Sequence, residues 1–329
     1  MSEKTIILSA PYMVPFKKRF LPILEHYGCK VIVPAVSERL SETELLRYAG
    51  EFDGTICGDD RYTRAVISQC IPRLKVISKW GTGIDSIDKA AAEELGVAVH
   101  RTINAFTVPV SDSVLGYILA FARQQPWMDE KVKAGVWQKQ PGRTLSECTL
   151  GVVGVGYIGK EVLRKAHAFG MELMANDIIP IPDDFINAHA VQVVGLHELL
   201  SRADFVSINC DLNPTSHRLI NQTMLGHMKN TAVLINTARG AIIDEQALIE
   251  ALKSGQIAGA ALDVFEQEPL PADSPLKEMD NVMLAPHNSN SSPRAWERVH
   301  WETLRNLLVG LDIPHHDFDE IQKQNSRIG

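Results

Sequence analysis

The chain has 329 residues, of which 45% are hydrophobic and 22% are charged, a composition typical of globular domains. One hydrophobic core rarely grows beyond about 250–300 residues, so two domains are expected. The formal net charge of -7 disfavours binding to nucleic acid or to an anionic membrane surface, although local charges still permit a small anionic substrate.

The N-terminus and the cysteines bear on the cellular location. Residues 1–9 lead directly into a predicted strand, without a basic segment followed by an apolar stretch. No apolar run approaches the roughly 18 residues of a membrane span. The five cysteines are odd in number, and no pair has metal-ligand spacing. We therefore predict a cytoplasmic protein with reduced thiols and without a metal site.

In the first third of the chain, short β-branched runs alternate with amphipathic stretches. Five runs predict strands, namely Thr5–Leu8, Val31–Val33, Thr55–Cys57, Lys75–Ser78 and Ala98–His100. A helix is expected to begin near Ser41, because Ser41 and Glu44 have the spacing of a capping box. This alternation predicts a parallel sheet covered by helices on both faces.

A second series of strands is predicted from Thr149 onward. Its members are Leu150–Val155, Leu173–Asn176, Phe205–Ile208, Ala232–Asn236, Gly259–Asp263 and Val282–Ala285. Between the two series we expect a helix at Val110–Arg123 and a polar loop at Gln124–Ser146. A last long helix, Pro293–Gly310, can return the chain to the first domain, and a polar tail follows it. The fold class is therefore α/β, with two doubly wound parallel sheets.

The strongest local motif is a glycine-rich turn. Gly154, Gly156 and Gly159 have G-x-G-x-x-G spacing, with Tyr157 and Ile158 between the last two glycines. A predicted strand precedes the motif and a helical pattern follows it. The first glycine permits a tight turn, the second lets the backbone approach a pyrophosphate, and the third lets helix and strand pack closely.

An acidic residue follows at the position where a ribose is expected. Asp177 stands at the end of the next predicted strand, where a carboxylate accepts hydrogen bonds from the adenosine ribose hydroxyls. Ile178–Pro180 provide no Arg or Lys for a 2′-phosphate, so NAD is favoured over NADP. The alternative is a glycine-rich turn in an unrelated α/β protein, with Asp177 as a solvated loop residue.

Three later strand ends carry polar side chains with complementary chemistry. They provide Arg239, then Asp263 and Glu268, and finally His287. Ligands of a doubly wound sheet bind outside the carboxyl ends of its strands, so these groups are expected on the edge that holds the glycine turn. Imidazole is a suitable base near neutral pH, a neighbouring carboxylate stabilises its charged form, and guanidinium binds a planar carboxylate.

Each of these residues alone has an ordinary explanation. Arg239 could cap a helix, Glu268 could be a plain loop residue, and His287 after Pro286 could be a turn histidine. Their occurrence together on successive strand ends is what favours a catalytic site.

Taken in order, these motifs resemble the D-isomer-specific 2-hydroxyacid dehydrogenase family. Four motifs follow one another in the order of that family, and they are closest to its D-3-phosphoglycerate dehydrogenase branch. The motifs are the glycine turn, Asn-Thr-Ala-Arg-Gly, Leu-Asp-Val-Phe-x-x-Glu-Pro and Ala-Pro-His. The resemblance runs from about Lys75 to Gly310. It implies that Arg239 binds the substrate carboxylate and carbonyl, that His287 is the acid/base, and that Glu268 orients His287.

The same resemblance implies the remaining contacts and the assembly. The cofactor is expected to meet Thr237, Asp263 and His287, and also Cys210, for which a small core thiol is the alternative. The substrate segment is expected to be Lys79, Trp80, Gly81, Thr82 and Gly83. The family fold has a discontinuous substrate domain, here residues 1–104 and 290–329, around an NAD-binding Rossmann domain at residues 105–289. A homodimer is expected through the region of Val110–Arg123 and the loop holding Trp127 and Trp137.

Departures from the family pattern leave the substrate open. Asp211 and Asn213 stand where proline and threonine are usual, and Asn288–Ser292 replace a glycine-containing turn. The prediction is hydride transfer between NAD and C2 of a D-2-hydroxy acid, with 3-phosphoglycerate favoured. Lys79 and Arg61 are the candidate partners of its phosphate, and Arg101 is a weaker choice.

Three alternatives remain. One is an unphosphorylated D-2-hydroxy acid, because Asp59 and Asp60 would repel a phosphate. Another is an NAD-sensing binding protein that resembles the C-terminal-binding corepressors. The third is another Rossmann enzyme, such as an epimerase or a short-chain reductase, which the lack of a Tyr-x-x-x-Lys pair disfavours.

Overall fold

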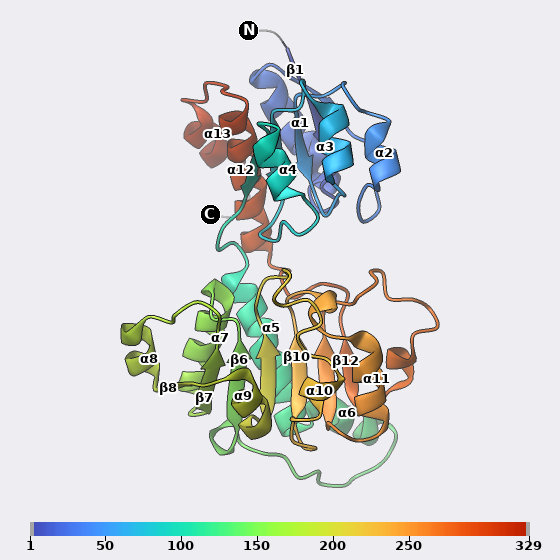
Figure 1. The fold of residues 1–329 in the computed structure, drawn as a ribbon, viewed down its shortest axis with the longest axis vertical. Coiled ribbons are helices and arrows are strands. Elements are labelled where there is room, and N and C mark those ends of the chain that lie inside the picture. Colours follow the sequence, from blue (N-terminus) through green and yellow to red (C-terminus); the bar gives the residue numbers. More distant parts are fainter. Residues whose placement is uncertain (1–2, 327–329) are drawn as a thin grey trace. The chain divides into compact units, whose positions relative to one another are not determined.

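The computed structural model describes residues 3–326, which separate into two compact units (Figure 1). One unit runs to Phe106 and resumes at Ser292, and the other spans Thr107–Ser291. Each junction lies two residues later than the domain boundary that the sequence predicts. Within the described residues, no helix has the length and apolar character needed to cross a membrane.

The first unit is a five-stranded parallel sheet with helices on both faces. Its strands are β1 (Lys4–Leu8), β2 (Cys29–Ile32), β3 (Gly54–Cys57), β4 (Val76–Lys79) and β5 (Ala98–Arg101), in the order β2-β1-β3-β4-β5. Its helices are α1 (Lys17–His26), α2 (Glu42–Leu46), α3 (Arg64–Cys70), α4 (Lys89–Glu94), α12 (Pro293–Gly310) and α13 (Phe318–Asn325). The predicted capping box is present at α2, where Ser41 and Glu44 exchange hydrogen bonds.

Alternate strand residues of the first unit point to opposite faces. One face carries Ile7 and Ile77, which are buried against a core that includes Val66 of α3 and Ala91 of α4. Helix α12 covers the other face, where the Ser78 hydroxyl donates to the Thr303 carbonyl at 2.8 Å. The predicted return of the chain to the first sheet is therefore present in the structure.

The second unit is a seven-stranded parallel sheet. Its strands are β6 (Thr149–Val153), β7 (Glu172–Asn176), β8 (Val191–Val193), β9 (Phe205–Ile208), β10 (Val233–Asn236), β11 (Gly259–Leu262) and β12 (Val282–Leu284). Their order is β12-β11-β10-β9-β6-β7-β8. Its helices are α5 (Thr107–Arg123), α6 (Gln125–Lys133), α7 (Tyr157–Ala168), α8 (Asp183–His189), α9 (Leu196–Arg202), α10 (Gln222–Leu225) and α11 (Glu245–Lys253).

This sheet separates two hydrophobic cores. Along β10, Val233 and Ile235 join the core beneath α5 and α7, whereas Leu234 joins the core beneath α9, α10 and α11. Such two-sided burial explains why the strands are short apolar runs rather than alternating ones. The predicted α/β class, with two doubly wound parallel sheets, is confirmed.

Three local predictions were wrong. The predicted loop after residue 124 begins with the helix α6, in which Trp127 packs on Phe121 and donates from its indole nitrogen to the Asp280 carbonyl at 2.8 Å. The edge strand β8 was missed because two of its three residues are exposed, so it is not a buried apolar run. The polar tail contains α13, which is anchored by the buried side chain of Phe318.

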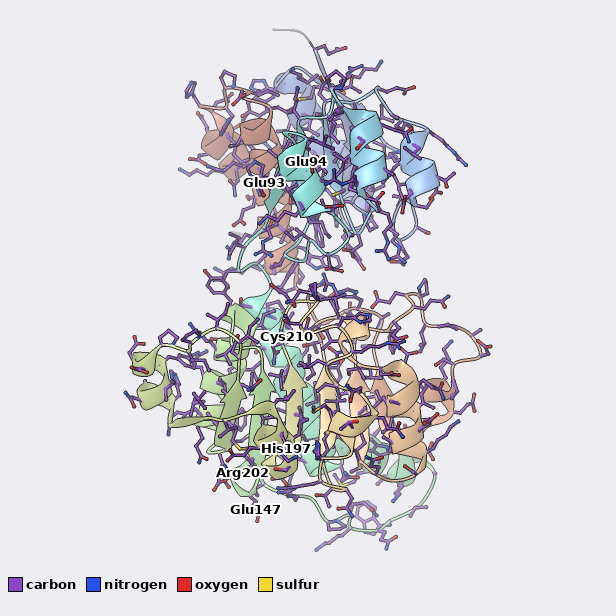
Figure 2. All side chains as sticks on the ribbon, viewed as in Figure 1. Glu93, Glu94, Glu147, His197, Arg202 and Cys210 are labelled. Carbon is purple, nitrogen blue, oxygen red and sulfur yellow. The ribbon has the colours of Figure 1, made fainter. Side chains whose placement is uncertain are left out.

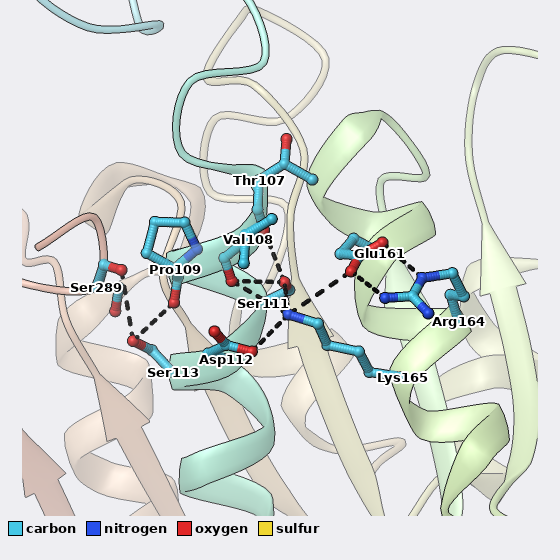
Figure 3. Close-up of polar contacts among 10 residues, drawn as sticks. All are labelled: Thr107, Val108, Pro109, Ser111, Asp112, Ser113, Glu161, Arg164, Lys165 and Ser289. Atoms are coloured by element: carbon cyan, nitrogen blue, oxygen red, sulfur yellow. Dashed lines mark hydrogen bonds and ion pairs between the residues drawn. The ribbon is translucent and has the colours of Figure 1, made fainter. Parts of the chain in front are cut away.

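Helix α5 is fastened to α7 by a lysine (Figure 3). The ammonium of Lys165 on α7 donates to the Ser111 hydroxyl at 2.7 Å, to the Asp112 carboxylate at 2.5 Å and to the Val108 carbonyl at 3.2 Å. Its side chain is only 17% exposed, so these partners satisfy an ammonium that is largely withdrawn from water. The first turns of α5 are thereby tied to the helix that follows the glycine turn.

The strand order reverses between β6 and β9, which is the topological switch point of this sheet. In an open parallel sheet, ligands bind outside the carboxyl ends of the strands at this point. The turns after β6, β7, β9, β10, β11 and β12 all emerge at that edge, because every strand runs in the same direction. The edge holds all of the site residues that the sequence assigns to this unit.

Candidate active site

The glycine turn has the three steric features that its spacing predicts. Gly154 has a φ of +88°, and a Cβ atom there would lie 2.4 Å from the Cys210 amide nitrogen. A Cβ at Gly159 would lie 2.1 Å from the Gly154 carbonyl oxygen, so the start of α7 packs directly on the turn. At Gly156, a Cβ would meet no atom within 4 Å, which leaves room for a phosphate at the N-terminus of this helix.

Asp177 fixes the glycine turn from the end of β7. One carboxylate oxygen accepts a hydrogen bond from the Val155 amide at 2.5 Å, and the other accepts from the Ile179 amide at 2.9 Å. A carboxylate has about four acceptor positions, so further acceptor capacity remains for ribose hydroxyls. The side chains of Ile178 and Ile179 beside it are 77% and 69% exposed, which places apolar surface next to the predicted ribose position.

Buried polar atoms at this edge lack partners within the described chain. They include the Oγ1 of Thr237 after β10 and the Oδ1 of Asn209 after β9. Buried polar atoms are normally hydrogen-bonded, so orphaned atoms indicate a missing ligand or water. Together with the steric cradle at Gly154, Gly156 and Gly159, they fit a dinucleotide. Asn209 was not among the predicted site residues, because its position next to the glycine turn follows from sheet order rather than from sequence distance.

Cys210 lies at the same end of the second unit, whereas His197, Arg202 and Glu147 lie toward the opposite end (Figure 2). Its partly buried thiol has a pKa raised to about 11 by burial. The thiol is therefore protonated at neutral pH. Its position beside Gly154 agrees with either reading of this cysteine, as a cofactor contact or as a packing thiol.

Glu268 and His287 form a hydrogen-bonded pair. The Nδ1 atom of His287 lies 2.9 Å from Oε2 of Glu268, while Oε1 accepts a hydrogen bond from the Phe265 amide at 3.0 Å. Burial raises the pKa of Glu268, but the hydrogen bond and the charge of His287, the Phe265 amide and the Arg239 charge together hold it below its ordinary value. The carboxylate is therefore ionised at neutral pH and can stabilise a charged imidazolium.

Asp263 anchors the turn that carries His287. Its side chain is 1% exposed, and its two oxygens accept hydrogen bonds from the amides of Asn288 at 2.7 Å and Ser289 at 2.8 Å. Its carbonyl accepts from the His287 amide at 2.8 Å. His287 has a φ of +52°, a conformation that is uncommon for residues other than glycine. The hydrogen bonds of Asp263 therefore maintain a backbone geometry that the sequence does not favour locally.

Arg239 begins a turn that is pressed against the loop of Glu268. The Asn236 side chain closes this turn, donating to the Arg239 carbonyl at 2.9 Å and accepting from the Ala238 amide at 3.0 Å. A Cβ at Gly240, which opens the short 3-10 helix Gly240–Ile242, would lie 1.9 Å from the Phe265 carbonyl carbon. Glycine is required here because the two loops meet backbone to backbone. Gly240 and Asn236 were not predicted as positioning residues.

The predicted substrate segment, Lys79–Gly83, lies in the first unit at the carboxyl end of β4. The Thr82 hydroxyl donates to the Thr102 carbonyl at 3.0 Å, and Gly81 has a φ of +115°. Lys79 is 4% exposed, and its ammonium lies 3.0 Å from the Asp59 carboxylate. Its strand position places the segment at the ligand-binding edge of its own sheet.

Comparison with known proteins supports what the geometry indicates. The family model described as "D-isomer specific 2-hydroxyacid dehydrogenase, NAD binding domain" matches residues 115–289. The chain belongs to the D-isomer specific 2-hydroxyacid dehydrogenase family. The predicted resemblance and the NAD cofactor are thereby confirmed. Thr237, Asn209 and the glycine turn are the features of this structure that fit the cofactor.

Relatives in the family have several names. The chain is 38% identical to a glyoxylate reductase of Thermofilum pendens, over 82% of each chain. It is also 38% identical to a D-3-phosphoglycerate dehydrogenase of Methanocaldococcus jannaschii, over 85% of this chain and 53% of the relative. The chain thus spans about half the length of that relative.

Solved structures have the same fold over nearly the whole chain. A D-lactate dehydrogenase from Aquifex aeolicus, complexed with NAD and lactic acid, has a TM-score of 0.82 and 26% identity, over 99% of each chain. A protein from Thermus thermophilus has a TM-score of 0.81 and 34% identity, over 94% of this chain and 97% of that chain.

Asp177 gives a prediction about cofactor choice. Its charge is expected to repel the 2′-phosphate of NADPH, so kcat/KM for NADH should exceed that for NADPH by at least about tenfold, equivalent to roughly 1.4 kcal/mol. Asp177→Asn should narrow this ratio. It removes the charge but keeps an acceptor for the Val155 amide, whereas Asp177→Ala removes both. Equal kcat/KM values for the two cofactors in the unaltered protein would refute the role of Asp177.

Proposed function

We propose that this protein is an NAD-dependent oxidoreductase that interconverts a D-2-hydroxy acid and its 2-oxo acid. The observation that carries the proposal is the His287–Glu268 pair at the carboxyl edge of an NAD-binding domain. NAD supplies the hydride acceptor when it is bound. The protein must then supply a base for the hydroxyl proton and a cation for the carboxylate.

His287 is proposed to exchange the proton of the substrate hydroxyl. Because Nδ1 is hydrogen-bonded to Glu268, the ring orientation is set and Nε2 is the nitrogen that serves as the acid/base. Glu268 stabilises the imidazolium that forms. Arg239, whose charge helps to hold Glu268 ionised, is proposed to bind the substrate carboxylate and to polarise the carbonyl of the 2-oxo acid.

Two substitutions test this acid/base assignment. His287→Ala should lower kcat by roughly 10²–10⁴, the usual contribution of a positioned proton donor. Glu268→Gln should move the imidazole limb of the kcat/KM pH profile to lower pH, because the imidazolium loses a stabilising carboxylate. His197→Ala, at the opposite end of the same unit, is the matched control and should leave kcat unchanged. An unaltered kcat in folded His287→Ala would eliminate the mechanism.

We further propose that the substrate is an unphosphorylated 2-oxo or 2-hydroxy acid, rather than the 3-phosphoglycerate that the sequence pattern favours. Of the two leading cations suggested for a phosphate, Lys79 has a side chain that is only 5% exposed and is paired with Asp59. Asp60 is fully buried and accepts hydrogen bonds from the Ser9 hydroxyl and the Leu40 amide. A dianion would therefore have to compete with Asp59 for Lys79, whereas Arg61 is an exposed side chain.

Glyoxylate, hydroxypyruvate and phosphohydroxypyruvate should be compared as substrates with NADH. We expect the phosphate to confer no advantage in kcat/KM. Two results together would replace our assignment with phosphoglycerate. The first is a kcat/KM for phosphohydroxypyruvate at least tenfold above that for hydroxypyruvate. The second is a loss of this difference in Lys79→Ala or Arg61→Ala but not in Lys75→Ala. Lys75 is exposed at the opposite end of β4 and serves as the control. Tight NADH binding without turnover of any 2-oxo acid would instead favour an NAD-sensing binding protein.

A homodimer remains our proposal, but we assign its contact to only one part of the region that the sequence suggests, the segment holding Trp137. Val114, Leu115, Ile118 and Ala122 of α5 are buried in the core of the second unit, so they do not require a partner. By contrast, Val132, Val136 and Trp137 are 51%, 45% and 91% exposed on one short segment. Exposed apolar side chains gathered in this way are typical of an interface.

Light scattering at micromolar concentration should therefore report a dimer. Trp137→Glu should shift the protein toward monomer, because it places a charge in the apolar segment. Val193→Glu is a control on the edge strand β8, at a valine that is 52% exposed, close to the 51% of Val132. A monomer in the unaltered protein, or equal effects of the two substitutions, would contradict the assignment of this segment.

A further inference from the structure

The indole of Trp80 lies in the middle of an aromatic cluster in the first unit. Its ring centroid lies 5.2 Å from that of Tyr12, 5.8 Å from Phe106, 6.0 Å from Trp296 and 5.7 Å from His300. Trp80 is 3% exposed and belongs to the predicted substrate segment Lys79–Gly83, in which Gly81 directly follows it. The orientation of its side chain therefore bears directly on this segment.

A buried hydrogen bond fixes that orientation. The Trp80 indole nitrogen, which can only donate, lies 2.9 Å from Nδ1 of His300 on α12. The histidine must therefore accept at Nδ1 and carry its proton on Nε2. His300 is 3% exposed, and burial lowers its pKa to about 4, so the ring is neutral at physiological pH. Phe16 and Phe20 pack beside it, with ring centroids at 5.4 Å and 5.3 Å.

The backbone of the substrate segment is anchored separately. The Trp80 amide donates to the Cys57 carbonyl at 2.9 Å, and the Trp80 carbonyl accepts from the Lys79 ammonium at 3.2 Å. The Arg101 guanidinium donates to the Thr82 carbonyl at 3.1 Å. The bonds from Trp80 to Cys57 and from Arg101 to Thr82 hold the main chain to the neighbouring strands β3 and β5. The hydrogen bond to His300 adds a constraint on the side chain from α12.

We propose that His300 is a positioning residue for the reaction, which fixes the Trp80 indole and through it the substrate-binding segment Lys79–Gly83. This inference rests on the proposed function, since that function assigns substrate binding to the segment. His300 does not contact the reacting atoms in this scheme; it acts by holding Trp80. Its effect is therefore expected on substrate affinity rather than on the binding of NADH, which belongs to the second unit.

The chemistry of the pair favours positioning over simple packing. An aromatic cluster would be filled equally well by two apolar rings, which need no hydrogen bond to be buried. Burying a polar pair costs the desolvation free energy of both groups, and only a hydrogen bond of good geometry between them offsets that cost. Such a pair restricts the indole to one orientation, whereas apolar contacts alone allow the ring to turn within the same space.

Four variants separate these roles. His300→Phe keeps a ring but removes the acceptor, and His300→Asn restores an acceptor close to the position of Nδ1. Trp80→Phe removes the donor, and the double variant Trp80→Phe with His300→Phe removes both. For each variant we would measure KM and kcat with hydroxypyruvate, the Kd of NADH by fluorescence, and the melting temperature.

His300→Phe is expected to raise KM for hydroxypyruvate by about tenfold, with kcat and the Kd of NADH changed by less than about twofold, because only substrate placement is disturbed. His300→Asn should recover most of the loss. In the Trp80→Phe background, His300→Phe should have little further effect, because the donor is already absent. If His300→Phe does not fold, the other two single variants still test the pair. Trp80→Phe should lose the low KM for hydroxypyruvate, and His300→Asn should keep it.

The indole resonances in a proton–nitrogen correlation spectrum provide a readout independent of activity. The five tryptophans give five such signals, and the one that disappears in Trp80→Phe belongs to Trp80. The indole N–H of Trp80 should exchange slowly with solvent in the unaltered protein and fast in His300→Phe. An unchanged KM in folded His300→Phe, in an enzyme that does turn over hydroxypyruvate, would overturn the inference alone. Failure of the unaltered protein to reduce any 2-oxo acid would instead overturn the proposed function.

Discussion

A buried carboxylate holds the turn on which the rest of the proposed chemistry depends. Asp263 stands at the end of β11, and its two oxygens bind the amides of Asn288 and Ser289. A non-glycine residue at positive φ, such as His287, costs on the order of 1–3 kcal/mol. Each hydrogen bond to an ionised group contributes about 1.5–3 kcal/mol, so this pair is sufficient to offset the strain. Without Asp263, the imidazole would not be presented to Glu268 in this geometry.

This arrangement changes how Asp263 itself is understood. The family resemblance implies that Asp263 contacts the cofactor, whereas the structure shows both of its oxygens already bound to the backbone of the His287 turn. The two tasks are compatible, because a carboxylate can accept further hydrogen bonds. The two tasks also connect the cofactor with the proposed acid/base residue, because Asp263 anchors the turn that carries His287. In the family pattern a glycine-containing turn follows this histidine; Asn288–Ser292 take its place here, and Asp263 accepts hydrogen bonds from the amides of the first two of these residues.

The sequence predicted the features that depend on local pattern. Strand positions follow from runs of β-branched residues, and the glycine turn follows from spacing within six residues, so both were found without a structure. Features that depend on non-local approach were missed. The contact of Gly240 with Phe265 and the burial of Lys79 beside Asp59 join residues about twenty or more positions apart. The pairing of Trp80 with His300 spans 220 positions. Helix α6 was missed because its polar composition lacks an apolar stripe, although Trp127 anchors it.

The discontinuous path of the first unit has a consequence for synthesis on the ribosome. Helix α12 completes the face of the first sheet, where Gly310 packs against Val76 so closely that a Cβ on the glycine would lie 2.3 Å from that side chain. The second unit, Thr107–Ser291, is made in between and is continuous. At 5–20 residues per second, β3 and β4 therefore wait roughly 10–50 s before their covering helix is complete. During that interval their apolar face is open to chaperones, while the dinucleotide-binding unit can already fold and bind its cofactor.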